Sequence, residues 1–246
     1  MKNHFTIVID TCNHEDWIER CINTCVTQDY DNFDVILVDA VSDDKTFEIA
    51  KKCAENFENL KVYQNEIRIP QVANFVWLNK QAAPGSIVVS IDGDDWFKNK
   101  KVLQKLNEVY NSGEVWMTYG TYEEFPYRNV SHIYQPYPED VIKNNSFREY
   151  RWMASHLRTW RRELFLKIDE NDLKKEDGEW LDTTGDQAIM FPMLEMSGEK
   201  SRHISEVTYI WNASNMSRDG AVNERRQEEL SRYIRAKNKY SPINEL

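Results

Sequence analysis

The stretch SIVVSIDGDDWF, residues 86–97, leads from an apolar run directly into a group of acids. The first seven residues have the Ile- and Val-rich composition of a buried strand. Asp92, Asp94 and Asp95 then fall within four positions. An ionised carboxylate at the end of a buried strand costs free energy unless a cation compensates it. We therefore expect these acids to bind a positively charged partner.

The apolar runs before this stretch alternate with segments in which apolar residues recur at helical spacing. Strands separated by helices predict a parallel sheet with right-handed crossovers, and runs such as VILV at 35–38 fit strands covered on both faces. We therefore predict a Rossmann-like α/β unit in the first half of the chain. Strands are expected at 5–9, 34–40, 61–65 and 86–92, and helices at 16–28, 42–57 and 71–83.

The second half is less regular, and it contains no internal repeat and no low-complexity linker. One domain over residues 1–246 is therefore favoured. Pro192 lies within the apolar pattern 186–198, so we expect that helix to kink or to start late. The other patterns predict a helix at 100–110, a strand at 115–125, a loop over the sheet at 126–148, an aromatic and basic segment leading into a helix at 156–168, and a peripheral helix after residue 218.

The composition limits the possible ligands and the location of the protein. Asp and Glu number 41 against 31 Lys and Arg, which gives a formal net charge of −10. A general nucleic-acid binder needs a basic stripe and is disfavoured, and an anionic ligand would need local cations. The start MKNHFTIVID does not resemble a signal peptide, and no run approaches the roughly 18 to 20 apolar residues that span a bilayer. We expect a cytoplasmic protein without a transmembrane segment.

Four polar side chains stand where the predicted parallel strands end: Asp10, Asp39, Asn65 and Asp92. Any one of them alone would more often be a turn or cap residue. Ligands of such sheets gather outside the carboxyl ends of the strands, so four polar residues at one rim indicate a ligand site.

Asp92 and Asp94 can reach one ion, because they are two positions apart at a strand end and Gly93 between them lets the backbone come close. Carboxylate oxygens suit Mg²⁺ and Mn²⁺, and one or two protein ligands leave room for phosphate oxygens. An Asx-turn that caps the next helix is the alternative interpretation of the motif. A metal-bound nucleoside diphosphate is one ligand that an acidic protein could hold in this way.

Three parts of the chain carry a resemblance to a known family. Residues 5–50 resemble the opening segment of glycosyltransferase family 2 enzymes of the GT-A fold. In that family a strand is followed by the motif PTYN, a helix and the motif Q-x-Y-x-x-F-E. A second strand then leads into the motifs VDDGS and x-D-x-T. SIDGDDWF resembles the metal and nucleotide-sugar motif of that family. GDQAIMFPMLEMSG, from residue 185, resembles the segment that holds its catalytic base. The match covers residues 5 to about 212.

The resemblance implies a role for several residues. Thr11 and Asp39 would border the base and ribose of the donor, and Asn65 would lie near the same nucleotide. Asp92 and Asp94, with Gly93, would hold the ribose and the metal-bound diphosphate, and Asp186 would be the general base. On this basis residues 1–98 form the nucleotide-sugar half, 99–218 the acceptor and catalytic half, and 219–246 a peripheral C-terminal helix.

The chain departs from the family pattern at several positions. Asp10 replaces the usual proline, and Ala40 replaces the second acid of VDD. The Ala-Arg-Asn segment expected before the fourth strand has no clear counterpart, so Arg68 is the candidate for the missing cation. His203 is either a further metal ligand or structural. Three basic residues, His156, Arg158 and Arg161, could neutralise diphosphate or bind an acceptor. Arg161 and Arg162 could equally belong to a solvated face. Four aromatic residues could stack on sugars or fill the core: Trp152, Trp160, Tyr209 and Trp211.

The residues and the resemblance together predict an inverting glycosyltransferase. The donor would be a nucleotide-sugar, with UDP-sugar favoured, the cofactor Mn²⁺ or Mg²⁺, and the acceptor a glycan, a lipid-linked group or a protein. A sugar nucleotidyltransferase is one alternative, but TCNHEDWIER lacks the glycine-rich phosphate loop that such an enzyme would show. A binding module that has lost catalysis is another, and the acids at positions 92, 94 and 186 speak against it.

Overall fold

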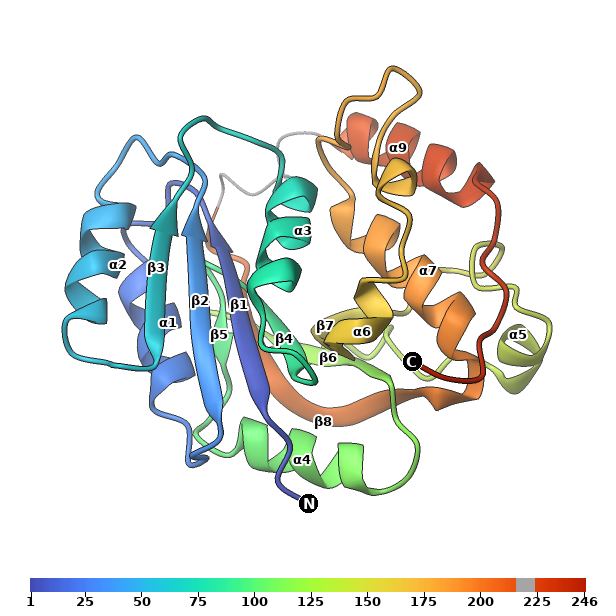
Figure 1. Ribbon diagram of the computed structural model, residues 1–246, viewed down its shortest axis with the longest axis horizontal. Coiled ribbons are helices and arrows are strands. Elements are labelled where there is room, and N and C mark those ends of the chain that lie inside the picture. Colours follow the sequence, from blue (N-terminus) through green and yellow to red (C-terminus); the bar gives the residue numbers. More distant parts are fainter. Residues whose placement is uncertain (216–223) are drawn as a thin grey trace.

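The computed structural model describes residues 1–215 and 224–246, within which eight strands form one sheet. Their order across the sheet is β3-β2-β1-β4-β7-β6-β8-β5 (Figure 1). The strands are β1 (Phe5–Thr11), β2 (Phe33–Asp39), β3 (Leu60–Gln64), β4 (Ile87–Asp92), β5 (Trp96–Phe97), β6 (Met117–Phe125), β7 (Ser155–Arg161) and β8 (Ser201–Asn212). The α-helices are α1 (Ile18–Val26), α2 (Thr46–Ala54), α3 (Gln71–Gln81), α4 (Val102–Asn111), α5 (Glu139–Lys143), α6 (Arg162–Phe165), α7 (Gly185–Ser197) and α9 (Glu224–Ala236), and short 3₁₀ turns cover Glu170–Leu173 and Gly198–Lys200.

The first four strands form the parallel unit that the sequence predicts. β2 and β4 flank β1, and β3 pairs with β2, all in parallel register. Figure 1 shows α1 and α2 on one side of these strands and α3 on the other. Ile7 and Ile9 pack into the core on the α1 side, whereas Val8 packs into the core on the α3 side. Both faces are buried, which is why these strands are continuous apolar runs. The predicted α/β class is confirmed.

β7 is a strand where the sequence predicts a segment that leads into a helix. It lies between β4 and β6 and is antiparallel to both. The helix that follows it, α6, has only four residues. Leu157 packs on one face of the sheet and Trp160 on the other. β7 is largely buried, but it contains buried polar side chains such as Arg158 and Thr159, so its sequence shows neither an apolar run nor an alternation of apolar and polar residues.

β6, β8 and β5 extend the sheet from β7 to its other edge. β8 is parallel to β6, and the two-residue β5 pairs with its far side. α5 follows Pro138 inside the segment predicted to be a loop at 126–148. α7 contains Pro192 but begins at Gly185, so it does not start late.

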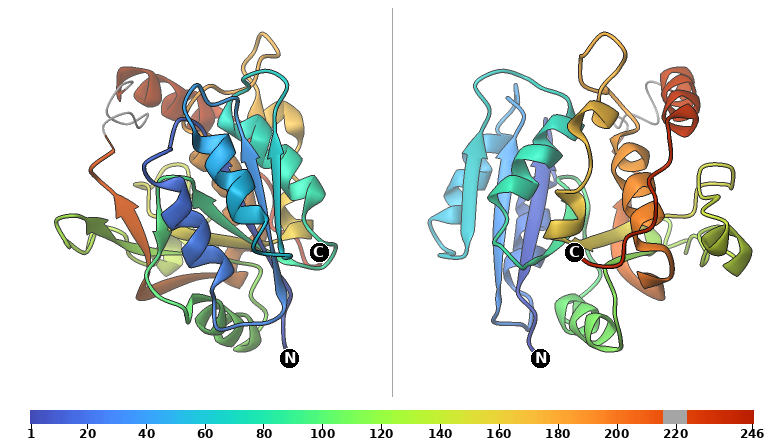
Figure 2. Two further views of the ribbon diagram at one scale, coloured as in Figure 1. Left: turned by 90° about the vertical axis from the view of Figure 1, so that its left-hand side faces the viewer. Right: turned by 45° about the vertical axis from the view of Figure 1, so that its right-hand side comes forward.

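α9 packs on α7, and Figure 2 shows this pair on the side of the molecule away from β3. Leu230 and Ile234 of α9 are buried in the same core as α7. The boundary proposed between residues 218 and 219 falls outside the described residues, and the division into halves stays a prediction. Among the described residues, no helix combines the length and apolar character that a membrane span requires.

Candidate active site

Two cavities open beside Asp92 at the end of β4. The smaller, of about 570 Å³, is lined mainly by the first half of the chain and includes Asp10, His14 and Asp94. The larger, of about 720 Å³, is lined by β7, the start of α7 and α9. Gln71, Asp92 and Trp211 line both cavities. Asp92 therefore stands at the junction of two spaces that could each receive part of a substrate.

The acid turn after β4 is held tightly against β1 and β8. The backbone N–H of Gly93 donates to the carbonyl oxygen of Asp10 at 3.0 Å. A Cβ atom at Gly93 would lie 2.3 Å from Thr11 Oγ1, so only glycine allows this approach. Asp95 accepts hydrogen bonds from the Tyr209 hydroxyl at 2.6 Å and from the Asn212 N–H at 2.7 Å. Asp95 thus anchors the turn.

The carboxyl groups at the junction lie in an electrostatically unfavourable position. Burial and the nearby negative charge of Asp94 together raise the pKa of Asp92 to about 6. Burial also raises the pKa of Asp10 to about 7, although Asn74 Nδ2 donates to Asp10 Oδ1 at 2.6 Å. Asn215 Nδ2 donates to Asp94 Oδ2 at 2.8 Å. A divalent cation would relieve the repulsion between these carboxylates.

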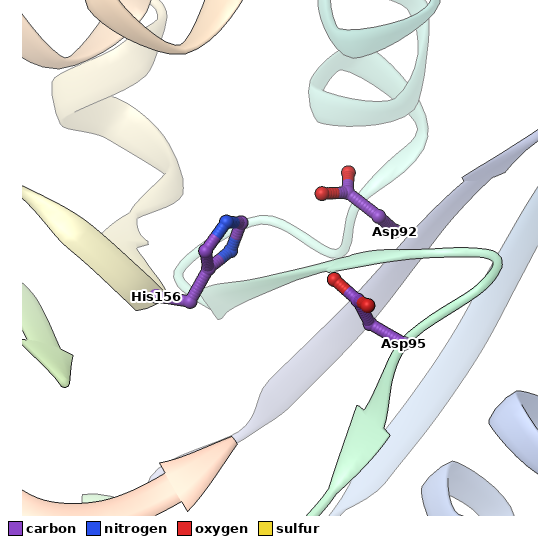
Figure 3. Close-up of side chains that lie close together, drawn as sticks. All are labelled: Asp92, Asp95 and His156. Carbon is purple, nitrogen blue, oxygen red and sulfur yellow. The ribbon is translucent and has the colours of Figure 1, made fainter. Parts of the chain in front are cut away.

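The side chains near the junction fit a hard divalent cation. Asp92, Asp95 and His156 offer ligand atoms that lie within 4.8 Å of one another, and Figure 3 shows the three side chains converging. Burial and the charge of Arg158 hold the pKa of His156 well below its usual value, so the imidazole is neutral, the form that binds metals. Oxygen ligands with one imidazole suit Mn²⁺, and the oxygens alone suit Mg²⁺.

His203, the histidine that the sequence suggested as a metal ligand, does not belong to this group. It lies on β8 opposite Tyr119, and the two ring centroids are 5.4 Å apart. His203 lines neither cavity, and its buried Nε2 has no hydrogen-bond partner among the described residues. The structure brings His156 to the acids instead. No sequence signal distinguished the two histidines, because β7 was not recognised as a strand.

Four of the predicted nucleotide-binding residues do not line the smaller cavity: Thr11, Asp39, Asn65 and Gly93. Asp39 is fully buried and accepts hydrogen bonds from the N–H of Ser42 at 3.0 Å and from Gln64 Nε2 at 3.0 Å. Thr11 Oγ1 is hydrogen-bonded to His14 Nδ1 at 3.1 Å. Asn65 Nδ2 donates to Asn74 Oδ1 at 2.8 Å. These contacts position the loops at the strand ends, and the nucleotide roles stay predictions.

The smaller cavity does contain the expected cation and polar groups that the sequence did not reveal. Arg68 lines it, and its Nη2 donates to Asp43 Oδ2 and to the carbonyl of Val41, each at 2.8 Å. His14 and Gln71 were not predicted. Gln71 Nε2 donates to Asp92 Oδ1 at 3.2 Å. His14 follows β1 directly, at the rim that the strand ends predict, whereas Gln71 begins α3 and reaches Asp92 through packing.

Asp186 lies in the first turn of α7 and lines the larger cavity. Its Oδ2 accepts a hydrogen bond from Arg158 Nη2 at 2.9 Å, and its Oδ1 accepts one from the Gln187 N–H at 2.8 Å. About a third of the side chain (31%) remains exposed, so the carboxylate can meet a ligand. Two other acids lie close enough in the sequence to compete for the role of base, Asp182 and Glu179. Asp182 lines the smaller cavity and pairs with Arg226 at 3.1 Å, and Glu179 lines neither cavity.

The aromatic and basic candidates divide into two groups. Trp160 is fully buried and donates from Nε1 to Asn79, and Tyr209 is buried beneath His156, so both are structural. Arg161 and Arg162 donate to backbone carbonyls. Trp152, Arg158 and Trp211 line the larger cavity, together with two tyrosines that the sequence analysis did not single out, Tyr122 and Tyr134.

The pKa of Asp10 gives a prediction for metal-free protein. An Asp that titrates near 3.9 when unfolded and near 7 when folded binds more protons in the folded state between these values. The contribution of Asp10 to the free energy of unfolding should therefore be largest below about pH 4 and fall as pH rises towards 7. Asparagine cannot ionise, so in Asp10→Asn the decrease in the free energy of unfolding over this pH range should be smaller than in wild type. The expected difference is of the order of 2–4 kcal/mol, because each pK unit corresponds to about 1.4 kcal/mol. Chemical denaturation in EDTA between pH 4.5 and 8 measures it, with Asp140→Asn on exposed α5 as the control. Identical pH profiles for Asp10→Asn and wild type would contradict the prediction.

Comparison with known proteins identifies relatives of the chain. The model of "Glycosyl transferase family 2" matches residues 6–169. An uncharacterized glycosyltransferase of Haemophilus influenzae is 30% identical over 118 residues, which cover 48% of this chain and 46% of that protein. A dolichyl N-acetyl-alpha-D-glucosaminyl phosphate 3-beta-D-2,3-diacetamido-2,3-dideoxy-beta-D-glucuronosyltransferase of Methanococcus voltae is 39% identical over 70 residues, which cover 27% of this chain and 22% of that protein. The matched segment thus spans less than half the length of either relative.

Solved structures share the fold. TarS 1–349 of S. aureus in complex with UDP-GlcNAc has a TM-score of 0.66 at 21% identity, with 85% of this chain and 58% of that chain covered. The mannosyltransferase PcManGT of Pyrobaculum calidifontis, in complex with GDP-Man and Mn²⁺, has a TM-score of 0.59 at 18% identity, with 86% and 57% covered. These similarities confirm the predicted GT-A architecture, a mainly parallel sheet flanked by helices. Because the family model matches residues 6–169, two thirds of this chain, the chain belongs to glycosyltransferase family 2.

Proposed function

We propose that this protein is an inverting glycosyltransferase that moves a sugar from a nucleoside-diphosphate donor to an acceptor hydroxyl. The observation that carries the proposal is the position of Asp92 between the two cavities, with Asp94 in the smaller and Asp186 in the larger. A donor whose diphosphate lies beside Asp94 would present its sugar at the junction. An acceptor in the larger cavity would then approach that sugar from the side of Asp186.

The smaller cavity is the proposed nucleotide site. Its volume is within the usual range for small-molecule sites, and His14, Arg68 and Gln71 supply polar groups along its wall. A UDP-sugar is the donor that we favour, and the complex of TarS with UDP-GlcNAc supports this choice. The mannosyltransferase complex with GDP-Man and Mn²⁺ supports a metal-bound nucleotide-sugar more generally.

Asp92 and Asp94, which both line the smaller cavity, are the proposed ligands of Mn²⁺ or Mg²⁺. His156 lies close to Asp92, whereas Asp94 is outside the group formed by Asp92, Asp95 and His156. The bound cation would offset the negative charge that grows on the departing diphosphate. Asp95 keeps the turn in place, because both of its oxygens already accept hydrogen bonds from β8. Arg158 contributes a fixed positive charge that lowers the pKa of Asp92 against the effect of burial.

Asp186 is the proposed general base. Arg158 orients its carboxylate, and the exposed part of the side chain faces the cavity in which an acceptor hydroxyl would arrive. The acceptor proton passes to Asp186 as the acceptor oxygen bonds to the anomeric carbon, and the bond from that carbon to the diphosphate breaks. Attack opposite the leaving group inverts the anomeric centre. Family membership and acids at both cavities favour this function over a nucleotidyltransferase or a module without catalysis.

Asp94→Asn tests the metal and donor assignment. Titration calorimetry with UDP should show tighter binding to wild-type protein when Mn²⁺ is present than in EDTA. Loss of a residue that only supports a metal ligand typically lowers metal affinity by roughly 10-fold, and loss of a ligand carboxylate should lower it at least as much. The variant should therefore lose most of the increase in UDP affinity that Mn²⁺ causes. Asp31→Asn, at an exposed pair with Lys2, is the control. Unchanged metal dependence in Asp94→Asn would rule out this assignment.

A further inference from the structure

One face of α9 forms a wall of the larger cavity. Its members follow the 3- and 4-residue spacing that places side chains on one helical face, whereas Leu230 and Ile234 on another face are buried against the core. The helix that the sequence predicts to be peripheral therefore lies beside the site. The cavity-lining residues of α9 are Glu224, Gln227, Glu228, Ser231, Arg232 and Arg235.

This face lies close to Asp186. Ser231 Oγ donates to Gln187 Oε1 at 2.7 Å, and Thr184 Oγ1 donates to the carbonyl of Gln227 at 3.4 Å. Thr184 and Gln187 flank Asp186 in the sequence. Arg235 follows Ser231 by one helical turn, which separates their Cβ atoms by about 6 Å. Arg235 is thus within the length of one or two sugar units of the proposed base.

Arg235 differs from the other cations of the cavity in its partners. Arg158 pairs with Asp186, and Arg232 pairs with Glu228 at 3.2 Å. Arg235 Nη1 donates to the carbonyls of Arg148 and Tyr150. Within residues 1–215 and 224–246, no carboxylate lies within 4.0 Å of Arg235, and its Nε and Nη2 make no hydrogen bond.

The surroundings of Arg235 favour an anion. Partial burial lowers the pKa of its guanidinium, which means that the charge is incompletely solvated. Glu149, a nearby acid, is already paired with Lys239 at 2.7 Å. Within the described part of the chain, this partly buried cation has no carboxylate at ion-pair distance, so it is suited to bind a negative group from a ligand.

An aromatic side chain lines the same cavity as this cation and approaches the same buried ring. Trp152 lines the same cavity and contacts the ring of Phe191, with centroids 5.2 Å apart. The Arg235 guanidinium lies 5.0 Å from that Phe191 ring. Trp152 and Arg235 are therefore both anchored on Phe191. A flat apolar surface beside a cation suits a sugar ring that carries an anionic substituent.

We propose that the acceptor is a saccharide bearing a carboxylate or a phosphate, that Arg235 binds this group through its Nε and Nη2, and that Trp152 packs against the sugar ring. This inference rests on the proposed glycosyl transfer and names the acceptor class for the same site. The two carbonyls that fix Nη1 hold the guanidinium in place, so its remaining donors are arranged for a bidentate contact.

Tryptophan fluorescence titrations test the proposal, because Trp152 and Trp211 line the cavity. The protein is saturated with UDP and Mn²⁺ so that the smaller cavity is filled. The probes are methyl β-glucuronide, glucose 6-phosphate and the neutral methyl β-glucoside, which separate a carboxylate from a phosphate. One anionic probe should bind wild type about 10-fold more tightly than the neutral probe, the scale of a charge-assisted hydrogen bond.

Arg235→Gln should remove this preference, Arg235→Lys should retain part of it, and Arg225→Gln, at a fully exposed position of α9, should leave it unchanged. Thermal melts show whether each variant is folded. Equal affinities for all three probes, no binding of either anionic probe, or an unchanged preference in Arg235→Gln would overturn the inference. If wild-type protein fails to bind UDP with Mn²⁺, the proposed function itself fails. If UDP binds and the anionic preference is missing, only the acceptor class is wrong.

Discussion

Replacing Asp186 with asparagine is expected to lower the rate of sugar transfer by roughly 10²-fold or more, the usual scale for loss of a general base. Asparagine has nearly the same shape and can still accept the hydrogen bond from Arg158 Nη2. It cannot take up the proton of an acceptor hydroxyl. UDP affinity should be retained, because Asp186 lines the larger cavity and does not line the smaller one. Release of UDP during turnover measures kcat, and calorimetry measures UDP binding.

Glu179→Gln is the matched control for this experiment. Glu179 is an exposed acid a few residues before α7 that lines neither cavity, so its substitution should leave transfer near the wild-type rate. Transfer by Asp186→Asn at a near wild-type rate would exclude Asp186 as the base and move the role to Asp182. Loss of both UDP binding and stability in Asp186→Asn would instead leave Asp186 with the structural role of ordering Arg158 and the start of α7.

The first half of the fold could be predicted because its strands are locally distinctive. β1, β2 and β4 are buried on both faces, so each is a short apolar run, and the helices between them show apolar residues at helical spacing. The resemblance of the motifs around Asp39 and Asp92 to family 2 enzymes supported the same assignment. The parallel pairing of these strands agrees with the prediction, whereas their order, β3-β2-β1-β4, was not predicted and comes from the structure.

His156 and Arg158 were basic candidates from the sequence, but their positions in the site depend on β7 and could not be predicted. β7 reaches the sheet between β4 and β6, and these neighbours are distant in the sequence. His156 and Arg158 therefore meet Asp92 and Asp186 only through tertiary packing. His203, which the sequence left open as a metal ligand or a structural residue, lies on β8 opposite Tyr119.

The position of α9 beside the larger cavity could not be predicted for a similar reason. Its sequence is highly charged, which is typical of a helix on the surface. Only the burial of Leu230 and Ile234 against the α7 core turns its polar face towards the larger cavity. A polar helix face that lines a cavity has the same composition as one that faces solvent. Where the polar face points depends on what the apolar face of the same helix packs against.

Glu195→Gln is expected to destabilise the protein by about 3–5 kcal/mol, because it would leave Arg148 as a buried charge without its anion. Arg148 and Glu195 are almost completely buried and form a two-point ion pair, with Nε donating to Oε1 at 2.5 Å and Nη2 donating to Oε2 at 2.9 Å. The pair joins α7 to the segment before β7. Denaturant unfolding, with a check that the transition is two-state, measures the change in free energy.

Matched variants separate this effect from the loss of an ordinary surface charge. Glu228→Gln removes an acid paired with Arg232 at the surface and should change the free energy of unfolding by no more than about 1 kcal/mol. Arg148 Nη1 also donates to the carbonyl of Ile234, and the Tyr240 N–H donates to Glu195 Oε2. In Glu195→Gln, amide hydrogen exchange should therefore accelerate in α9 more than in β1 or β2. A loss below about 1 kcal/mol in Glu195→Gln would show that the buried pair is neutral or solvated, and that the packing of Leu230 and Ile234 alone holds α9 beside the cavity.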